Sequence, residues 1–125
     1  MTFLFLRKQE ILLLHTRLIE LFGGSPGLRD SGALESALTA PENRASYENP
    51  SLAVRAATYA YHLTQAHAFV DGNKRVAAAA TELFVELNGK KLLATNDQLV
   101  TLFLQIAAGE VNREEVEHFF TLWLD

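Results

Sequence analysis

Nine consecutive residues near the middle of the chain carry most of the reactive side chains of this sequence. Residues 67–75 read His-Ala-Phe-Val-Asp-Gly-Asn-Lys-Arg and combine an imidazole, a carboxylate, an amide, an ammonium and a guanidinium around one glycine. Apolar residues at helical spacing precede and follow the segment, so we expect a loop that leads directly into the start of a helix. A helix start attracts anions through its unpaired N–H groups and the positive end of its dipole. The segment therefore predicts an anion-binding site.

The second half of this segment has the side chains of a phosphate cradle. Gly72 permits the positive φ of a tight turn, and Asn73 can cap the next helix or hydrogen-bond a phosphate oxygen. Lys74 supplies a point charge, and Arg75 supplies a planar fork for two oxygens. Basic residues at the first two positions of a helix oppose its dipole, and a bound anion removes that conflict. We expect these four residues to stabilise charge on a transferring phosphoryl group.

The first half of the segment offers a base and a metal ligand. Mg²⁺ favours one or two protein carboxylates completed by substrate phosphates and water, and Asp71 can supply such a carboxylate beside the cradle. A histidine side chain ordinarily titrates at a pH of ~6.5. His67 is therefore suited to take a proton from an attacking hydroxyl. Phe69 is expected to be the buried anchor of the loop.

Each of these residues also has an ordinary structural interpretation. His67 can end a helix, Asp71 and its glycine form a common turn pair, and two basic residues can form a solvated first turn. The segment is not a Walker loop, because the Gly-Lys-Ser/Thr ending is missing. Zinc binding by histidines is disfavoured, because His62 and His67 point to different faces of a helix and His15 and His118 are distant in sequence.

The elements that must position this segment are helices. Apolar residues recur with the 3.6-residue period along most of the chain, which predicts an all-α fold, a compact bundle of about six helices with the active-site loop between the third and the fourth. The inward faces are expected to include Leu21 in the first helix and Leu87 in the fourth. Residues 1–6 are expected to form a short strand or a tail packed on the core, and residues 42–50 an exposed loop.

Caps and turn residues set the expected helix boundaries. The first helix is expected to run from Arg7 to Phe22, and the second to be capped by Ser31 and to stop before Pro41. The third is expected to start at Ser51 and run toward His67, and the fourth to end at Asn88-Gly89. The fifth is expected to be capped by Thr95 or Asn96 and to end at Gly109, and the last to be capped by Asn112.

Composition fits one intracellular domain. The chain has 125 residues, of which 49% are hydrophobic, so we expect a single domain over residues 1–125. It has no cysteine, which excludes disulfides and thiolate metal sites and suits the cytoplasm, where we expect the protein to be located. A net charge of -4 argues against direct nucleic-acid binding. The apolar segment at the start is only six residues long, which is too short for a signal peptide or a membrane span.

The segment at 67–75 resembles the signature of the Fic/Doc family, His-x-Phe-x-Asp/Glu-Gly-Asn-x-Arg. It is most similar to the death-on-curing (Doc) branch, in which lysine precedes the arginine, as Lys74 does here. Residues 23–30, the alanine-rich third helix and Asn88-Gly89 also resemble that branch, so the likeness covers nearly the whole chain.

This resemblance implies an activity and a setting. In the general Fic pattern AMP is transferred from ATP to a target hydroxyl, and a second arginine follows at the position where this chain has Ala78. Ala78 together with Lys74 points to the Doc variation, a protein kinase that transfers the γ-phosphate of ATP with Mg²⁺. The implied target is a threonine of elongation factor Tu, and the implied partner is a small Phd-like antitoxin. No inhibitory glutamate helix of the Fic type is recognisable, so inhibition is expected from a partner chain.

Carried over by position, the resemblance gives each residue a role. His67 activates the target hydroxyl, Asp71 holds Mg²⁺, and Phe69 supports the loop, while the phosphates are cradled by Gly72, Asn73, Lys74 and Arg75.

Two other functions stay open: an adenylyltransferase of the general Fic type, and a non-catalytic module that only binds an antitoxin or repressor. A further hypothesis places target docking at Arg44 and Tyr47, in the expected loop at residues 42–50. An ordinary surface loop explains that segment equally well.

Overall fold

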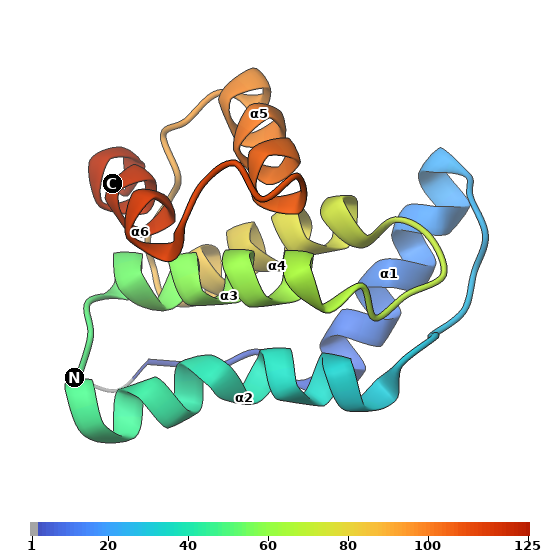
Figure 1. Ribbon diagram of the computed structural model, residues 1–125, viewed down its shortest axis with the longest axis horizontal. Helices are drawn as coiled ribbons and strands as arrows, with labels where there is room; N and C mark the ends of the chain where they lie inside the picture. Colours follow the sequence, from blue (N-terminus) through green and yellow to red (C-terminus); the bar gives the residue numbers. More distant parts are fainter. Residues whose placement is uncertain (1–2) are drawn as a thin grey trace.

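The helical prediction is confirmed along the described chain. The computed structural model describes residues 3–125, which form six α-helices and no β-sheet (Figure 1). The helices are α1 (Lys8–Phe22), α2 (Ser31–Glu48), α3 (Leu52–Ala66), α4 (Asn73–Leu87), α5 (Asn96–Ala107) and α6 (Arg113–Trp123). Over these residues no helix combines the length and the hydropathy that crossing a membrane requires. The bundle places the 67–72 loop between α3 and α4, as expected.

Helix α3 lies at the centre of the bundle. Helices α2, α4, α5 and α6 all contact it, and α1 packs against α4 and α2 (Figure 1). Of its 15 residues, 10 are buried. The distance between packed helices depends on the side chains between them, and buried alanines permit a close approach to α3. These are Ala53, Ala56, Ala57 and Ala60. Helix α3 is therefore held from several sides, and so is the loop that follows it.

The N-terminal tail packs on the core. Leu6 is buried, and its backbone N–H donates to the Tyr59 hydroxyl of α3 at 3.0 Å. Burial raises the pKa of Tyr59 to about 12, so this hydroxyl stays protonated. Phe3 and Phe5 also pack against the core, and residues 3–6 form no strand. The packed tail is therefore the correct alternative for residues 3–6, while residues 1–2 lie outside the described residues.

Three predicted N-caps are confirmed. The side chains of Ser51, Thr95 and Asn112 each accept a hydrogen bond from the backbone N–H three residues further on, at the starts of α3, α5 and α6. Such a cap is worth about 1 kcal/mol because it satisfies a donor that the helix itself cannot. The start of α3, and with it the register of the helix that leads to His67, is therefore fixed by a local contact.

The prediction was wrong for the second helix. Helix α2 passes through Pro41 and continues to Glu48, and only Asn49, with φ of 50°, ends it. A proline inside a helix removes one hydrogen bond and costs about 3 kcal/mol. Here the ring of Pro41 is fully buried, and the turns after it pack against α3. Burial therefore overrides the local preference, and the expected loop at residues 42–50 is mostly helical.

Two residues of the predicted inward faces are exposed instead. Leu21 is 69% exposed and Leu87 is 40% exposed. Both lie in the last turn of their helices, where the apolar stripe extends past the packed neighbours. The two buried residues of α1 are Ile11 and His15, four residues apart on one face.

Candidate active site

The loop formed by residues 67–72, called here the signature loop, leads onto a cleft between α4 and α5. Figure 1 shows the loop leaving α3 and turning back into α4 on the side of the molecule where α1 ends. The cleft has a volume of about 760 Å³ and is lined by residues 71–75, by Ala78 and Glu82 of α4, by residues of α5 and by Phe22. Five of the predicted site residues thus share one cleft. His67 lies outside this lining, at the start of the loop.

His67 occupies a constrained backbone position. It is the C-cap of α3, with φ of 47° and ψ of 44°, and its side chain is on the exposed surface. A left-handed conformation costs a non-glycine residue of order 1–3 kcal/mol, and such strain concentrates at functional sites. The guanidinium of Arg29 donates to the His67 carbonyl and holds the turn. The imidazole is therefore presented to solvent from a backbone that is fixed on both sides.

The signature loop is held in place by the segment between α1 and α2. The N–H groups of Arg29 and Asp30 donate to the Ala68 carbonyl at 2.7 and 2.9 Å, and the Val70 N–H donates to the Gly27 carbonyl at 3.1 Å. These bonds pair the two loops as a short antiparallel ladder centred on Leu28 and Phe69. The geometry of the site is thus set by residues some 40 positions earlier in the chain.

The carboxylate of Asp71 is fixed by two backbone donors. Ser25 N–H donates to Oδ2 at 3.1 Å and Gly72 N–H to Oδ1 at 2.8 Å. These bonds hold the pKa of Asp71 below its usual range, with a smaller contribution from the charge of Arg75. A side chain at position 24 would clash, because a Cβ on Gly24 would lie 2.6 Å from Oδ2. Asp71 is therefore ionised at neutral pH, and its carboxylate is held in one orientation.

The start of α4 differs from the expectation for Asn73. Gly72 is the N-cap, with φ of 75°, and Asn73 is the first residue of the helix. Its amide accepts from the Phe69 N–H and donates to the Phe69 carbonyl, both at 2.9 Å. Asn73 thus does not cap the helix; its side chain braces the signature loop. The open N–H groups of the first turn are backbone groups and remain directed outward from the helix start.

Lys74 and Arg75 occupy the second and third positions of α4 and are exposed. Among residues 3–125, no carboxylate lies within 4 Å of either cation. The Arg75 guanidinium instead lies 4.8 Å from the centre of the Phe22 ring at the end of α1. A cation–π contact of this kind is weak at an exposed position, about 0.5–1 kcal/mol. Both charges are therefore available to an anion in the cleft.

Phe69 is 3% exposed, as expected of a loop anchor. Its ring stacks on the imidazole of His15 in α1, with centroids 3.9 Å apart and an angle of 14° between the planes. Sequence reasoning did not include His15 in the site, nor Ser25 and Arg29. One signal for His15 was available, because it lies four residues after Ile11 on the apolar face of its helix, where a polar side chain indicates a buried hydrogen bond.

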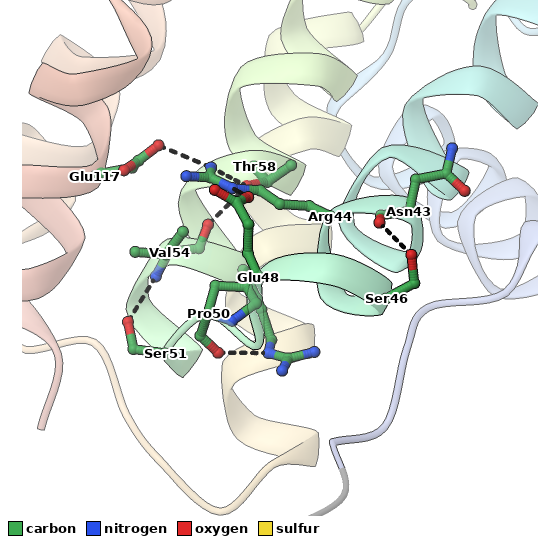
Figure 2. A network of polar contacts seen from close by, with 10 residues as sticks. Asn43, Arg44, Ser46, Glu48, Pro50, Ser51, Val54, Thr58 and Glu117 are labelled. Carbon is green, nitrogen blue, oxygen red and sulfur yellow. Dashed lines mark hydrogen bonds and ion pairs between the residues drawn. The ribbon is translucent and has the colours of Figure 1, made fainter.

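Arg44 and Tyr47 lie away from this site. They are on the last turns of α2, next to the start of α3 and therefore at the opposite end of α3 from His67 (Figure 1). Figure 2 shows Arg44 directed between Glu48 and Glu117, with its guanidinium also on the Thr58 hydroxyl. The docking hypothesis assumed an exposed loop, and that assumption was wrong, because α2 continues to Glu48. Tyr47 is 75% exposed.

Comparison with known protein families identifies the family of this chain. The model of the Fic/DOC family matches residues 5–85, which include α1, the 23–30 segment, the signature loop and most of α4. The chain belongs to the Fic/Doc family. This Fic/Doc chain is 32% identical over 109 residues to the protein kinase Doc of Escherichia phage P1, and the match covers 86% of each chain. It is 40% identical over 78 residues to the toxin Doc of Mycolicibacterium smegmatis, covering 61% of this chain and 60% of that protein.

Proposed function

We propose that this Fic/Doc protein is the toxin of a toxin–antitoxin pair and that it transfers the γ-phosphate of ATP to a hydroxyl of a target protein. The observation that carries the proposal is the pairing of an oriented, ionised Asp71 with the basic start of α4 in one cleft. The names of the two relatives, a protein kinase and a toxin, support it.

The start of α4 is the part of the site suited to phosphates. The N–H groups of its first turn, Lys74 and Arg75 bring positive charge to the cleft. Such fixed charge stabilises a transferring phosphoryl group, and this stabilisation usually contributes most of the rate enhancement in phosphoryl transfer. Bound phosphate also relieves the unfavourable placement of two cations at a helix start.

Asp71 is the residue that would hold Mg²⁺. Within residues 3–125 no three histidine, aspartate or glutamate side chains converge as metal ligands. A cation at Asp71 would thus take its other ligands from substrate phosphate and water, which is the usual arrangement for Mg²⁺. When bound, the ion neutralises phosphate charge. The carboxylate oxygens keep lone pairs for this role beyond the two backbone bonds.

His67 would act as the general base. It takes the proton of the target hydroxyl on an imidazole nitrogen as the hydroxyl oxygen forms a bond to the γ-phosphorus. The bond between that phosphorus and the β,γ-bridging oxygen breaks, and ADP leaves with the bonding electron pair. The exposed position of His67 at the start of the signature loop suits a macromolecular hydroxyl that arrives from outside the cleft.

Two residues favour transfer of phosphate over transfer of AMP. Lys74 stands at the variable position of the signature, and Ala78 lines the cleft where the general Fic pattern has a second arginine. The cleft wall at position 78 therefore lacks the guanidinium that the AMP-transferring enzymes use. The proposed target is a threonine of elongation factor Tu, the proposed inhibitor is a Phd-like antitoxin, and the proposed place of action is the cytoplasm.

The test is a mass measurement on the target. Elongation factor Tu is incubated with the chain, ATP and Mg²⁺, and its intact mass and modified residue are determined; the Asp71→Asn chain and a reaction without Mg²⁺ are the controls. A gain of one phosphate on a threonine is expected. A gain of a whole AMP would make the protein an adenylyltransferase, and an unmodified factor would remove elongation factor Tu as the target.

A growth experiment separates catalysis from simple binding. Expression of the parent chain is expected to arrest growth, and expression of His67→Ala or Asp71→Ala is not. If both variants arrest growth as the parent does, the protein is a non-catalytic binding module.

A further inference from the structure

The proposed mechanism leaves one buried polar side chain of the site without a role. His15 is 4% exposed, in the middle of α1. Its ring stacks on Phe69, and its Nε2 lies 2.7 Å from the carbonyl oxygen of Asp71. Burying an imidazole among apolar groups is unfavourable unless the ring is hydrogen-bonded. The contact with Asp71 therefore satisfies the buried ring and connects α1 to the signature loop.

The direction of this hydrogen bond follows from its acceptor. A carbonyl oxygen can only accept, so the Nε2 atom of His15 must carry the hydrogen. Both the neutral Nε2–H form and the imidazolium meet this requirement.

The bond fixes the peptide unit between Asp71 and Gly72. The carbonyl of Asp71 and the N–H of Gly72 belong to one planar group and move together. His15 holds the carbonyl on one side, and the Asp71 carboxylate accepts from the N–H at 2.8 Å on the other. If this peptide rotates, the carboxylate loses a donor and the N-cap of α4 changes its conformation.

Helix α1 also lies close to Gly72. A Cβ on Gly72 would lie 3.6 Å from His15 Nε2 and 3.5 Å from Ile19 Cδ1. A side chain at the N-cap of α4 would therefore be in van der Waals contact with this face of α1. The distances leave no room for a water molecule between His15 and Asp71.

We infer that His15 is a positioning residue: through its Nε2–H it sets the orientation of the peptide that joins the metal-binding carboxylate to the phosphate cradle. The inference rests on the proposed function, because the two groups that His15 aligns are the two that phosphoryl transfer needs. His15 touches neither nucleotide nor target and acts through Asp71 and Gly72.

The test compares glutamine and methionine at position 15. The two side chains have similar length and both lack the ring, but only glutamine can donate to the Asp71 carbonyl. We expect kcat to fall by about 10- to 100-fold in His15→Met, as for a small misplacement of catalytic groups. His15→Gln is expected to recover most of that loss, and KM for ATP is expected to change less than kcat in both. His118→Met, at an exposed position of α6, is the matched control with parental kcat.

A second readout does not depend on activity. The amide resonance of Gly72 in a ¹H–¹⁵N spectrum is expected to shift in both variants because the ring is lost, and to shift further in His15→Met than in His15→Gln because only glutamine keeps the hydrogen bond. Equal kcat in the glutamine and methionine variants, with equal shifts of the Gly72 resonance, would overturn the inference. If His15→Met does not fold, His15→Phe, which keeps a ring on Phe69 but lacks the donor, takes its place with the same expectations. Failure of the proposed function is seen separately, as a parent chain that transfers no phosphate while the Gly72 resonance still responds.

Discussion

The cations near the two ends of helix α3 have opposite surroundings. At its start, Arg44 is only 23% exposed and is bound by Glu48 and Glu117 from two other turns of chain (Figure 2). At its end, Lys74 and Arg75 stand at the start of α4 with no carboxylate within 4 Å among residues 3–125. Arg44 connects α2, α3 and α6, whereas neither of the other two cations is paired with a carboxylate among the described residues.

These two regions differ in the surroundings of their cations and not in the presence of positive charge. The carboxylates near Arg44 raise its pKa, chiefly through the hydrogen bond to Glu117. The carboxylate near Arg75 belongs to Asp71, which is already held by two N–H groups and oriented toward the cleft. Groups left uncompensated in a cleft are candidates for function.

The largest expected effect is at the functional end of α3. His67→Ala removes the proposed base, so the rate of phosphate transfer is expected to fall by about 10²- to 10⁴-fold. Because the side chain is exposed, the free energy of unfolding is expected to change by less than ~1 kcal/mol. Enzyme assay and urea unfolding measure the two quantities. A variant that keeps parental turnover would show that His67 is not the base.

The next largest effect is a difference in activity between alanine variants of two adjacent glycines. Gly24→Ala is expected to lower the rate at least about tenfold and the stability by about 1–3 kcal/mol, because the position has φ of 114° and the new Cβ would meet the Asp71 carboxylate. Gly23→Ala is the control: its φ is 83°, but nothing lies within 4 Å of the added Cβ. It is expected to lose stability by about 1 kcal/mol and keep its activity. Equal activities in the two variants would contradict the proposed link between position 24 and Asp71.

A smaller effect is expected at the structural end of α3. Arg44→Ala leaves Glu117 without its partner and is expected to lower the free energy of unfolding by about 1–2 kcal/mol, with kcat unchanged. Tyr47→Ala, at an exposed position one turn away, is expected to change it by less than ~0.5 kcal/mol. Chemical unfolding and target phosphorylation are measured for both. If Arg44→Ala slowed transfer without affecting stability, the result would support target docking at Arg44.

The smallest effect concerns pH. Asp71 has a lower pKa in the folded chain than a free carboxyl, because Ser25 and Gly72 donate to its ionised form. Its contribution to stability is therefore complete above the unfolded-state pKa of ~3.9 and is lost as pH falls through the folded-state value. The stability difference between the parent and Asp71→Asn is expected to be constant between about pH 5 and 8 and to shrink below about pH 4. A difference that varied near neutral pH would show that Asp71 is not ionised there.

Local signals in the sequence were sufficient for most of the fold. Ser51, Thr95 and Asn112 could be recognised as caps because the acceptor and the donor lie three residues apart. The end of the second helix was predicted wrongly at Pro41, because the rule that a helix stops before proline is also local. The burial of this ring and the packing of the turns after it depend on residues far along the chain.

The residues of the candidate site that lie in one segment could be proposed from the sequence. The residues that distant segments contribute could not. His67, Asp71 and the start of α4 lie within nine residues. His15 reaches the same loop from 56 residues before Asp71, and the Ser25 contact spans 46 residues. The ion pair of Arg44 could not be predicted for the same reason, because its partner Glu117 lies 73 residues away.

The burial of α3 has a consequence for hydrogen exchange. Its amides sit in the middle of the bundle, so we expect them to exchange with solvent only when the whole protein unfolds, and to be among the slowest in the chain. His67 is attached to the end of that helix, whereas the ladder between residues 27–30 and 68–70 lies at the surface and is expected to exchange sooner. The proposed base would then be attached to the part of the molecule whose amides exchange most slowly. The segment at residues 27–30, which aligns the loop, would belong to a part whose amides exchange sooner.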